Sequence, residues 1–231
     1  MSNRKVRVAL LSAACVLLAA APPIASAAQR AVRLAPFSSL ELNLPAHYII
    51  RESSAASALV KGSSEVIDRV VIEQHDDRVR IYVPGSISIE GELTIEVHTL
   101  GLKELDVNGA GQVEARGFSG QEFSLRLLGA PTAKISGLDV EKLSVEMQGS
   151  AGAELSGRAT RERMRIAGTG QCRASDLAAD KAVVKLEGAA NVEVMARERL
   201  DVNIAGAGSV RYRGDPKLST SIAGSGTVAR M

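Results

Sequence analysis

The sequence predicts an all-β fold, a single-stranded parallel β-helix (solenoid) with coils of about 20 residues and an N-terminal β-rich cap. Three observations lead to this prediction: a repeat with regular spacing, apolar residues that alternate with polar ones, and a low aromatic content. The repeat has the form apolar-x-apolar-x-Gly-small-small-x-apolar, and its glycines recur every 18 to 20 residues. They are Gly109, Gly129, Gly149, Gly168, Gly188, Gly206 and Gly224.

The residues in front of each glycine indicate which side of the strand is buried. Positions two and four before the glycine are apolar in nearly every repeat, as Val107 and Leu105 are in the first. Because side chains alternate along a strand, these positions face inward and the position between them faces solvent. This outward column consists of Asp106, Arg126, Glu146, Arg165, Lys185 and Asn203, followed by Ser221.

The outward column has two interpretations. In-register stacking would place Asp106 beside Arg126 and Arg126 beside Glu146, and opposite charges at such positions stabilise a sheet by about 0.2–1 kcal/mol each. The column would then keep the protein soluble and maintain the register. Alternatively, the same polar face is the candidate binding face for a glycan.

The repeated glycine predicts a corner of each coil. A coil this short must bend sharply, and glycine reaches positive φ without a steric cost. An apolar column four residues later, from Val113 through Cys172 to Val228, indicates that a second strand begins after the corner. A second group of glycines eight residues past the first predicts another corner and two or three short strands per coil.

The composition agrees with a narrow aliphatic interior. Hydrophobic residues make up 45% of the chain, aromatic residues only 3%, and tryptophan is absent. Val, Ile, Leu and Ala therefore have to fill the core, as expected for a solenoid rather than for a globular core built on large rings.

Residues 33–104 are less regular, and we expect them to cap the first coil, whose core would otherwise be exposed. Strands are predicted on both sides of Pro45, a hairpin at Asp76 and Asp77, and a short helical turn within residues 63–70. No linker divides the chain, so residues 28–231 are predicted to form one domain, with the cap at 33–104 and seven regular coils at 105–230.

The N-terminus is typical of an export signal over residues 1–27. A basic start precedes an apolar run and an Ala-Ser-Ala site, which predicts a mature chain that begins at Ala28. The residues before Cys15 resemble a lipoprotein signal, but Ser12 stands where leucine is preferred, so the unlipidated form is favoured. After cleavage we expect no integral membrane segment and a location in the periplasm, outside the cell or at its surface.

Removal of residues 1–27 takes away three basic residues and leaves 25 Lys and Arg against 26 Asp and Glu, a net charge of −1. The mature chain has no run of basic residues, so nucleic acid is not an expected partner. Its single cysteine, Cys172, lies in an inward column and is expected to be buried.

Several segments resemble a known family. The opening "FSSLELNLPAHYIIRE", then "SSEVIDRVVIEQHDDRVRIYV", then "LTIEVHTLGLKELDVNGAGQVE" ahead of the glycine repeats, are similar to the DUF2807 family of adhesin-like head GIN domains. The likeness covers about residues 37 to 230. It implies an exported, parallel β-helical bacterial protein, and it supplies no catalytic residues to transfer.

The sequence indicates no catalytic, cofactor-binding or metal-binding residues. His47, His75 and His98 fall on separate predicted strands without a metal-ligand spacing. We therefore predict a non-catalytic envelope protein without a cofactor, a binding, adhesin-like or structural module whose partner is an envelope glycan or protein. The alternative is a glycan-active β-helical lyase or hydrolase, which would need carboxylates clustered on one face.

Overall fold

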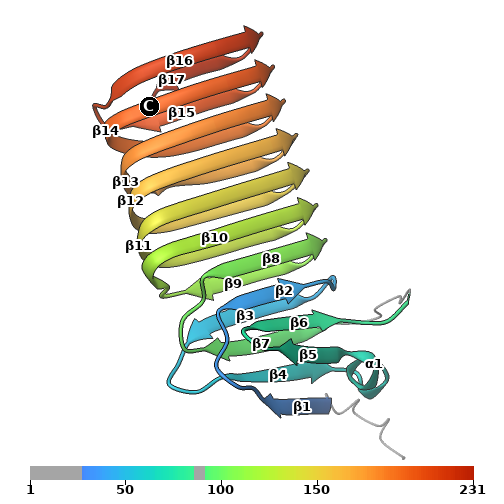
Figure 1. The fold of residues 1–231 in the computed structure, drawn as a ribbon. Helices are drawn as coiled ribbons and strands as arrows, with labels where there is room; N and C mark the ends of the chain where they lie inside the picture. The colour runs from blue at the N-terminus through green and yellow to red at the C-terminus, as the bar shows by residue number, and fades with distance from the viewer. Residues whose placement is uncertain (1–27, 86–91) are drawn as a thin grey trace, which may run out of the picture.

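The computed structural model describes residues 28–85 and 92–231, and these residues form a stack of flattened β-coils (Figure 1). They contain 17 strands, all in one continuous sheet, and a single short helix. The predicted all-β solenoid is therefore confirmed. The expected signal peptide, with Cys15, lies outside the described residues.

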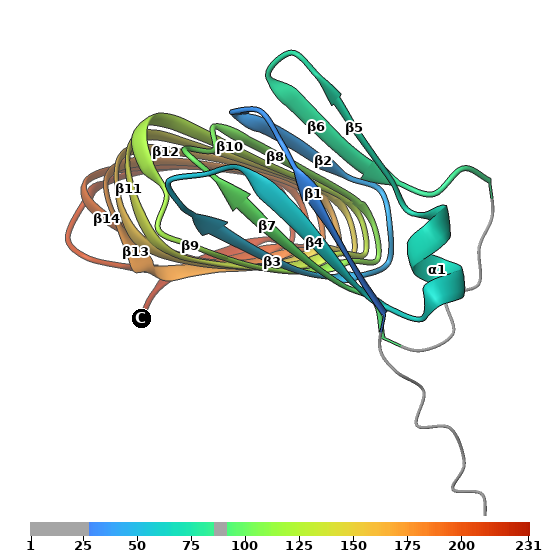
Figure 2. The ribbon, with the colours of Figure 1, turned by 90° about the horizontal axis from the view of Figure 1, so that it is seen from below.

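Each regular coil has two faces that run along the stack, seen end-on in Figure 2. The first face consists of β8, β10 and β16 together with the C-terminal parts of β11–β14, and the second consists of β9, β15 and β17 together with the N-terminal parts of β11–β14. The strands of the coils are β8 (Glu104–Gly109), β9 (Gln112–Arg116), β10 (Ser119–Gly129), β11 (Thr132–Gly149), β12 (Gly152–Gly168), β13 (Gln171–Gly188), β14 (Asn191–Gly206), β15 (Ser209–Arg213), β16 (Lys217–Gly224) and β17 (Thr227–Arg230).

The structure corrects the prediction of two or three short strands per coil. In β11–β14 the chain passes the second corner without leaving the ladder, and only the register shifts there, between Ile135 and Leu138 on β11 for example. Gly137 has a φ of 71° at this point. The backbone keeps its partners on the neighbouring coils through the bend, so the corner is a bulge within one long strand.

The repeat positions stack in register, as the sequence predicts. Leu127 pairs with Val107 on one side and with Met147 on the other, and all three are buried. The last coil differs, because no further described coil covers it. Ile222 is 43% exposed there, and every residue of β16 is exposed.

The first corner depends on glycine for two reasons. Gly168 has a φ of 129°, which L side chains rarely adopt. A Cβ atom at this position would lie 2.2 Å from the carbonyl oxygen of Gly149 in the coil below. Both the backbone conformation and the close stacking of corners therefore require glycine.

The N-terminal region begins the solenoid out of chain order. Here β2 (Ser39–Leu42) pairs in parallel with both β6 (Arg78–Tyr82) and β8, while β3 (His47–Glu52) pairs with both β7 (Thr94–Thr99) and β9. Residues 39–52 thus form a coil of the solenoid inside the region expected to be only a cap.

The outer end of the stack is covered by the remaining N-terminal elements. Antiparallel pairing joins β1 (Ala28–Arg33) to β4 (Ser57–Gly62) and β4 to β7. The helical turn is confirmed as α1 (Ser64–Arg69), and the predicted hairpin joins β5 (Val71–His75) to β6 through Asp76 and Asp77. None of the described helices is long and apolar enough to cross a membrane.

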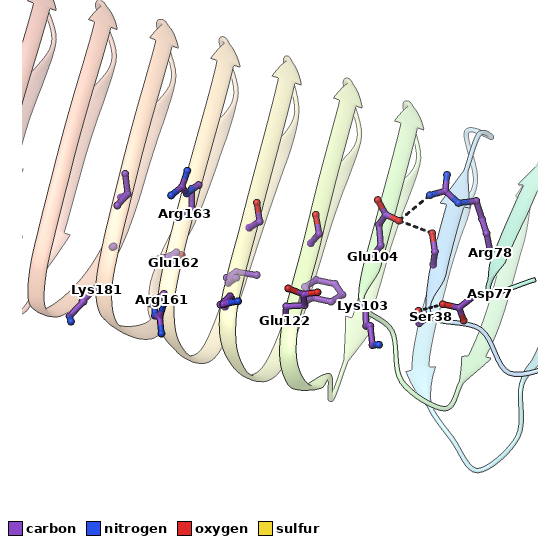
Figure 3. A pocket seen from close by; sticks show the side chains of 18 of the residues that line it. Ser38, Asp77, Arg78, Lys103, Glu104, Glu122, Arg161, Glu162, Arg163 and Lys181 are labelled. Atoms are coloured by element: carbon purple, nitrogen blue, oxygen red, sulfur yellow. Dashed lines mark hydrogen bonds and ion pairs between the residues drawn. The ribbon is translucent and has the colours of Figure 1, made fainter.

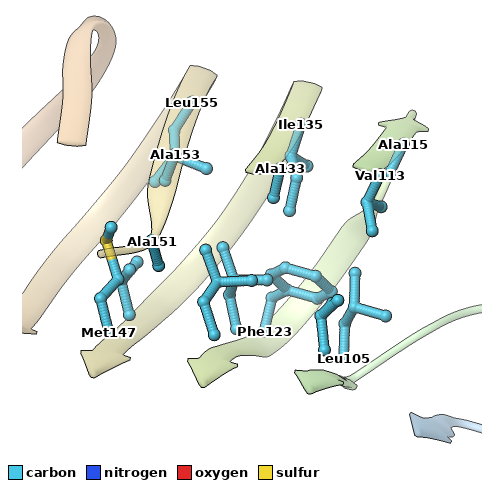
Figure 4. Packing of buried hydrophobic residues seen from close by; sticks show 14 of the residues in the cluster. Leu105, Val113, Ala115, Phe123, Ala133, Ile135, Met147, Ala151, Ala153 and Leu155 are labelled. Carbon is cyan, nitrogen blue, oxygen red and sulfur yellow. The ribbon is translucent and has the colours of Figure 1, made fainter. Parts of the chain in front are cut away.

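The interior consists of aliphatic ladders from the two faces (Figure 4). Leu105 and Met147 lie on one face, and Val113, Ala133 and Leu155 lie on the other, all of them buried. Phe118 and Phe123 are an exception to this aliphatic packing. Their rings stack beside a bend, with centroids 5.3 Å apart.

Candidate functional site

The outward column stands in register on the first face, from β8 to β14. Arg126 lies between two carboxylates of neighbouring coils. Its Nη1 is 3.3 Å from Asp106 Oδ1, and its Nε is 3.5 Å from Glu146 Oε2. Charges of opposite sign therefore alternate at this end of the column, as the sequence predicts.

Toward the C-terminus the column becomes cationic. Arg165 is the register partner of Lys185, so two like charges stand on adjacent strands. Neither Arg165 nor Lys185 forms an ion pair with any other described residue. The six column residues thus divide into an ion-paired half near the cap and an unpaired basic half that ends at Asn203.

Asp106 is less accessible than the rest of the column. Its exposed fraction is 7%, because neighbouring side chains cover it. Burial raises the pKa of this carboxyl above its usual value, and the Arg126 guanidinium opposes that shift. The Asp106 carboxylate therefore lies beneath neighbouring side chains and is not open to a ligand.

A groove of about 1100 Å³ runs across the strands beside the outward column (Figure 3). It starts at the turn between β5 and β6, where Ser38 donates a hydrogen bond to Asp77, and it ends at Arg199 and Asp201 on β14. Its floor includes the short side chains of Ser124, Ser144 and Val183, and Arg163 of β12 lies between the last two. The groove is open and elongated, so it suits a chain-like ligand.

One side of this groove carries a row of basic residues that the sequence reasoning missed. We call this set the basic row; its members occupy the position seven before the corner glycine and pair in register from strand to strand. The basic row consists of Lys142, Arg161, Lys181 and Arg199, which line the groove, and Lys217 on β16, which lies past its end. These residues recur at a fixed position of the repeat, but successive members are 18 to 20 residues apart in the chain. They therefore form no local basic run.

Glu162 lies in the groove lining but belongs to the core. It occupies an inward position between Leu143 and Ala182, is 2% exposed, and neither carboxyl oxygen has a hydrogen-bond partner among the described residues. Burial raises the pKa of Glu162 to about 8. The carboxyl is therefore largely protonated at neutral pH and does not cancel the charge of the arginines on either side of it in the chain.

Cys172 is fully buried, as predicted. Its Sγ lies 3.9 Å from the Sδ of Met164, and burial raises the pKa of the thiol well above its usual range. The side chain fills the core and offers no nucleophile to solvent.

The three histidines lie apart, on β3, β5 and β7. His47 Nε2 is 3.6 Å from Glu114 Oε1 at a second, smaller hollow of about 300 Å³ on the other face. Within residues 28–85 and 92–231 there is no group of three His, Cys, Asp or Glu side chains placed to hold a metal ion.

The fold and the groove together define an all-β solenoid with one long, charged, shallow surface. A family model described as "Putative auto-transporter adhesin, head GIN domain" matches residues 36–216. The chain belongs to this family, DUF2807. No curated protein matches the chain.

Solved structures share the fold. A Bacteroides fragilis protein titled a putative adhesin superposes with a TM-score of 0.77 at 18% identity, over 89% of this chain and 97% of that one. A Parabacteroides distasonis protein titled a putative lipid binding protein gives 0.71 at 22% identity, over 89% and 96%. A second P. distasonis protein, titled a putative adhesin, gives 0.63 at 17% identity, over 90% and 98%.

Proposed function

We propose that this chain is an exported, non-catalytic binding module of the bacterial envelope that recognises a surface polymer through its first face. The observation that supports this function best is the groove, which extends across successive coils alongside the outward column. The description of the family as adhesin-like and the titles of the similar structures agree with a binding role.

The form of the groove favours a linear polymer over a small molecule. Small-molecule sites are concave and enclose most of their ligand. This groove is open along its length and is lined by charged and hydroxyl side chains such as Arg163, Ser144 and Asp201. A solenoid supplies such an extended surface because each coil adds one more set of side chains to it.

A triple variant tests the face. Arg126→Gln, Arg165→Gln and Lys185→Gln together remove the cations of the outward column, and we expect them to weaken binding at least tenfold to the ligand found by screening the purified mature protein against envelope glycans. The matched control is Arg116→Gln, Lys134→Gln and Arg173→Gln on the second face, which changes the charge equally. Equal loss of binding in both variants would contradict the proposal.

The same experiment separates binding from catalysis. Bond cleavage in a glycan requires an acid and a base in contact with the substrate. The binding function predicts saturable association and no shortened glycan at any time. Glycan depolymerised by the purified chain, and lost on replacement of one groove carboxylate such as Asp201, would favour the lyase or hydrolase alternative.

Export has its own test. Expression with residues 1–231 in a bacterial host should give a mature protein that begins at Ala28 and carries no lipid, and intact mass measures both properties. A diacylated species that begins at Cys15 would instead place the protein on a membrane surface through a lipid anchor.

A further inference from the structure

We propose that the basic row and its part of the groove bind a linear polyanionic polysaccharide that carries one carboxylate per sugar, with the polymer lying across the strands. This inference rests on the proposed binding function and names the class of polymer. It depends on the charge pattern of the groove rather than on the outward column, so the two can be tested separately.

Like charges stack along the basic row. Arg161 pairs in register with Lys142 on one side and with Lys181 on the other, and Arg199 and Lys217 continue the row. Parallel strands lie about 4.8 Å apart, and like charges at facing positions destabilise a sheet. Folding alone favours alternation, as at Asp106, Arg126 and Glu146, so a bound polyanion gives this arrangement a function.

Three cations over β11 and β12 have no internal counter-charge among the described residues. Lys142, Arg161 and Arg163 form no ion pair with any described residue. Two members of the row have partners: Lys181 Nζ is 3.8 Å from Glu198 Oε2, and Arg199 donates two hydrogen bonds to the Asp201 carboxylate, of 2.7 and 2.9 Å. Arg163 and Arg161 both line the groove, from the same strand, so their guanidinium groups are free for carboxylates.

The charge of the groove changes along the stack. Its end near the cap contains four carboxylates, Asp76, Asp77, Glu104 and Glu122, against the two cations Arg78 and Lys103. The part over β11–β14 contains five Lys and Arg side chains against the exposed carboxylate of Asp201 (Figure 3). A polyanion is therefore repelled from the cap end and held over the basic row. Five strands span about 19 Å between the first and the last, which suits a segment of roughly four to five sugars.

The floor has short side chains on both sides of one cation. Arg163 of β12 lies in the same column as Ser144 on β11 and Val183 on β13, which are both short and stand between the basic row and the outward column. Sugar rings can rest on them while carboxylates reach the basic row. A neutral glycan of the same shape would gain the floor contacts alone, so the negative charge of the polymer decides the affinity.

The test uses oligogalacturonates of two to eight sugars and the same oligomers with their carboxyls methyl-esterified. The mature protein should bind the acidic oligomers with an affinity that rises up to about five sugars and falls steeply with salt, and it should bind the esters at least tenfold more weakly. The variant Arg161→Gln/Lys181→Gln should weaken acidic binding at least tenfold and reduce the slope of log affinity against log salt by about one to two.

The matched control is Arg116→Gln/Arg173→Gln on the second face, which should bind within twofold of the parent. Urea midpoints within experimental error of the parent establish that both variants are folded. No binding of the acidic oligomers, equal binding of the esters, or equal loss in the control would overturn the inference. If the inference fails in this way while the triple variant of the outward column still weakens binding to an envelope ligand, the proposed function stands without it.

Discussion

The guanidinium of Arg126 lies against the carboxylate of Asp106 on the preceding coil, with Nη1 3.3 Å from both carboxylate oxygens. Asp106 is only 7% exposed, so the contact joins a nearly buried carboxylate to the guanidinium next to it in the outward column. We expect Arg126→Ala to lower the free energy of unfolding by about 1 kcal/mol, near the upper end for surface pairs. Urea denaturation at low salt measures the loss, which should shrink at high salt.

An inward substitution should be far more costly. Ile166 is buried between Met147 and Leu186 of the neighbouring coils. Ile166→Asp would place a carboxylate there without a partner, and we expect a loss of about 3–5 kcal/mol in the free energy of unfolding. Arg126→Ala serves as the outward comparison in the same urea titration. Equal midpoints for the two variants would show that the assignment of faces is wrong.

Glu162 should make stability depend on pH. Burial raises its pKa in the folded protein to about 8, whereas an unfolded glutamate titrates near 4.5. The folded state therefore retains a proton that the unfolded state releases, so the contribution of Glu162 to stability is highest below about pH 4.5 and falls as pH rises to about 8. The slope approaches about 1.4 kcal/mol per pH unit for one group.

Glu162→Met should remove this slope and raise stability at pH 8, since it replaces an unpaired buried carboxyl with an apolar side chain of similar length. Glu187→Met at an exposed position of β13 is the control and should leave the slope unchanged. Urea midpoints between pH 5 and 8 provide the measurement. A parent protein with constant midpoints over this range would mean that Glu162 is stabilised by a contact absent from the fold described above.

The requirement for glycine at the corners can be tested by alanine substitution at a corner glycine and at a glycine within a strand. Gly168→Ala would force a Cβ to within 2.2 Å of a backbone oxygen at positive φ, so we expect a loss of at least about 2 kcal/mol. Gly152→Ala, in ordinary strand conformation and 3.4 Å from the Thr132 side chain, should change stability by less than about 0.5 kcal/mol. Thermal midpoints of both variants check this difference, and similar midpoints would refute the steric explanation.

Cys172 should be inert in the native protein. The side chain is 0% exposed, and burial raises the pKa of the thiol. In a protein that begins at Ala28 it is the single thiol, so an aromatic disulfide reagent should report on it alone. We expect less than a tenth of the thiol to react within an hour in buffer and complete reaction in denaturing urea; rapid native reaction would mean that the coil opens locally.

The repeat pattern predicts the fold because a solenoid is built from neighbours in the chain. Val107 and Asp106, two and three residues before their glycine, lie on opposite sides of one strand. In the next repeat an apolar and a charged residue occupy the same positions on the neighbouring strand. Period 2 and a spacing of 18 to 20 residues therefore determined the buried ladders, the corner glycines, the buried position of Cys172 and the alternating half of the outward column.

Other features arose from pairings that no local pattern encodes. The insertion of β2 between β6 and β8 joins residues about 40 and 65 positions apart, and it brings the turn at Asp76 to one end of the groove. The periodicity of the repeat predicts that Glu162 faces inward. Its lack of a hydrogen-bond partner among the described residues depends on which side chains surround it.

The sequence by itself determined the class of fold, the family and which face is polar, because each follows from short-range periodicity repeated along the chain. Only the tertiary structure decided where charges accumulate. Arg161 and Lys181 are 20 residues apart in the chain and adjacent in space, so the basic row exists only once the coils have stacked in register.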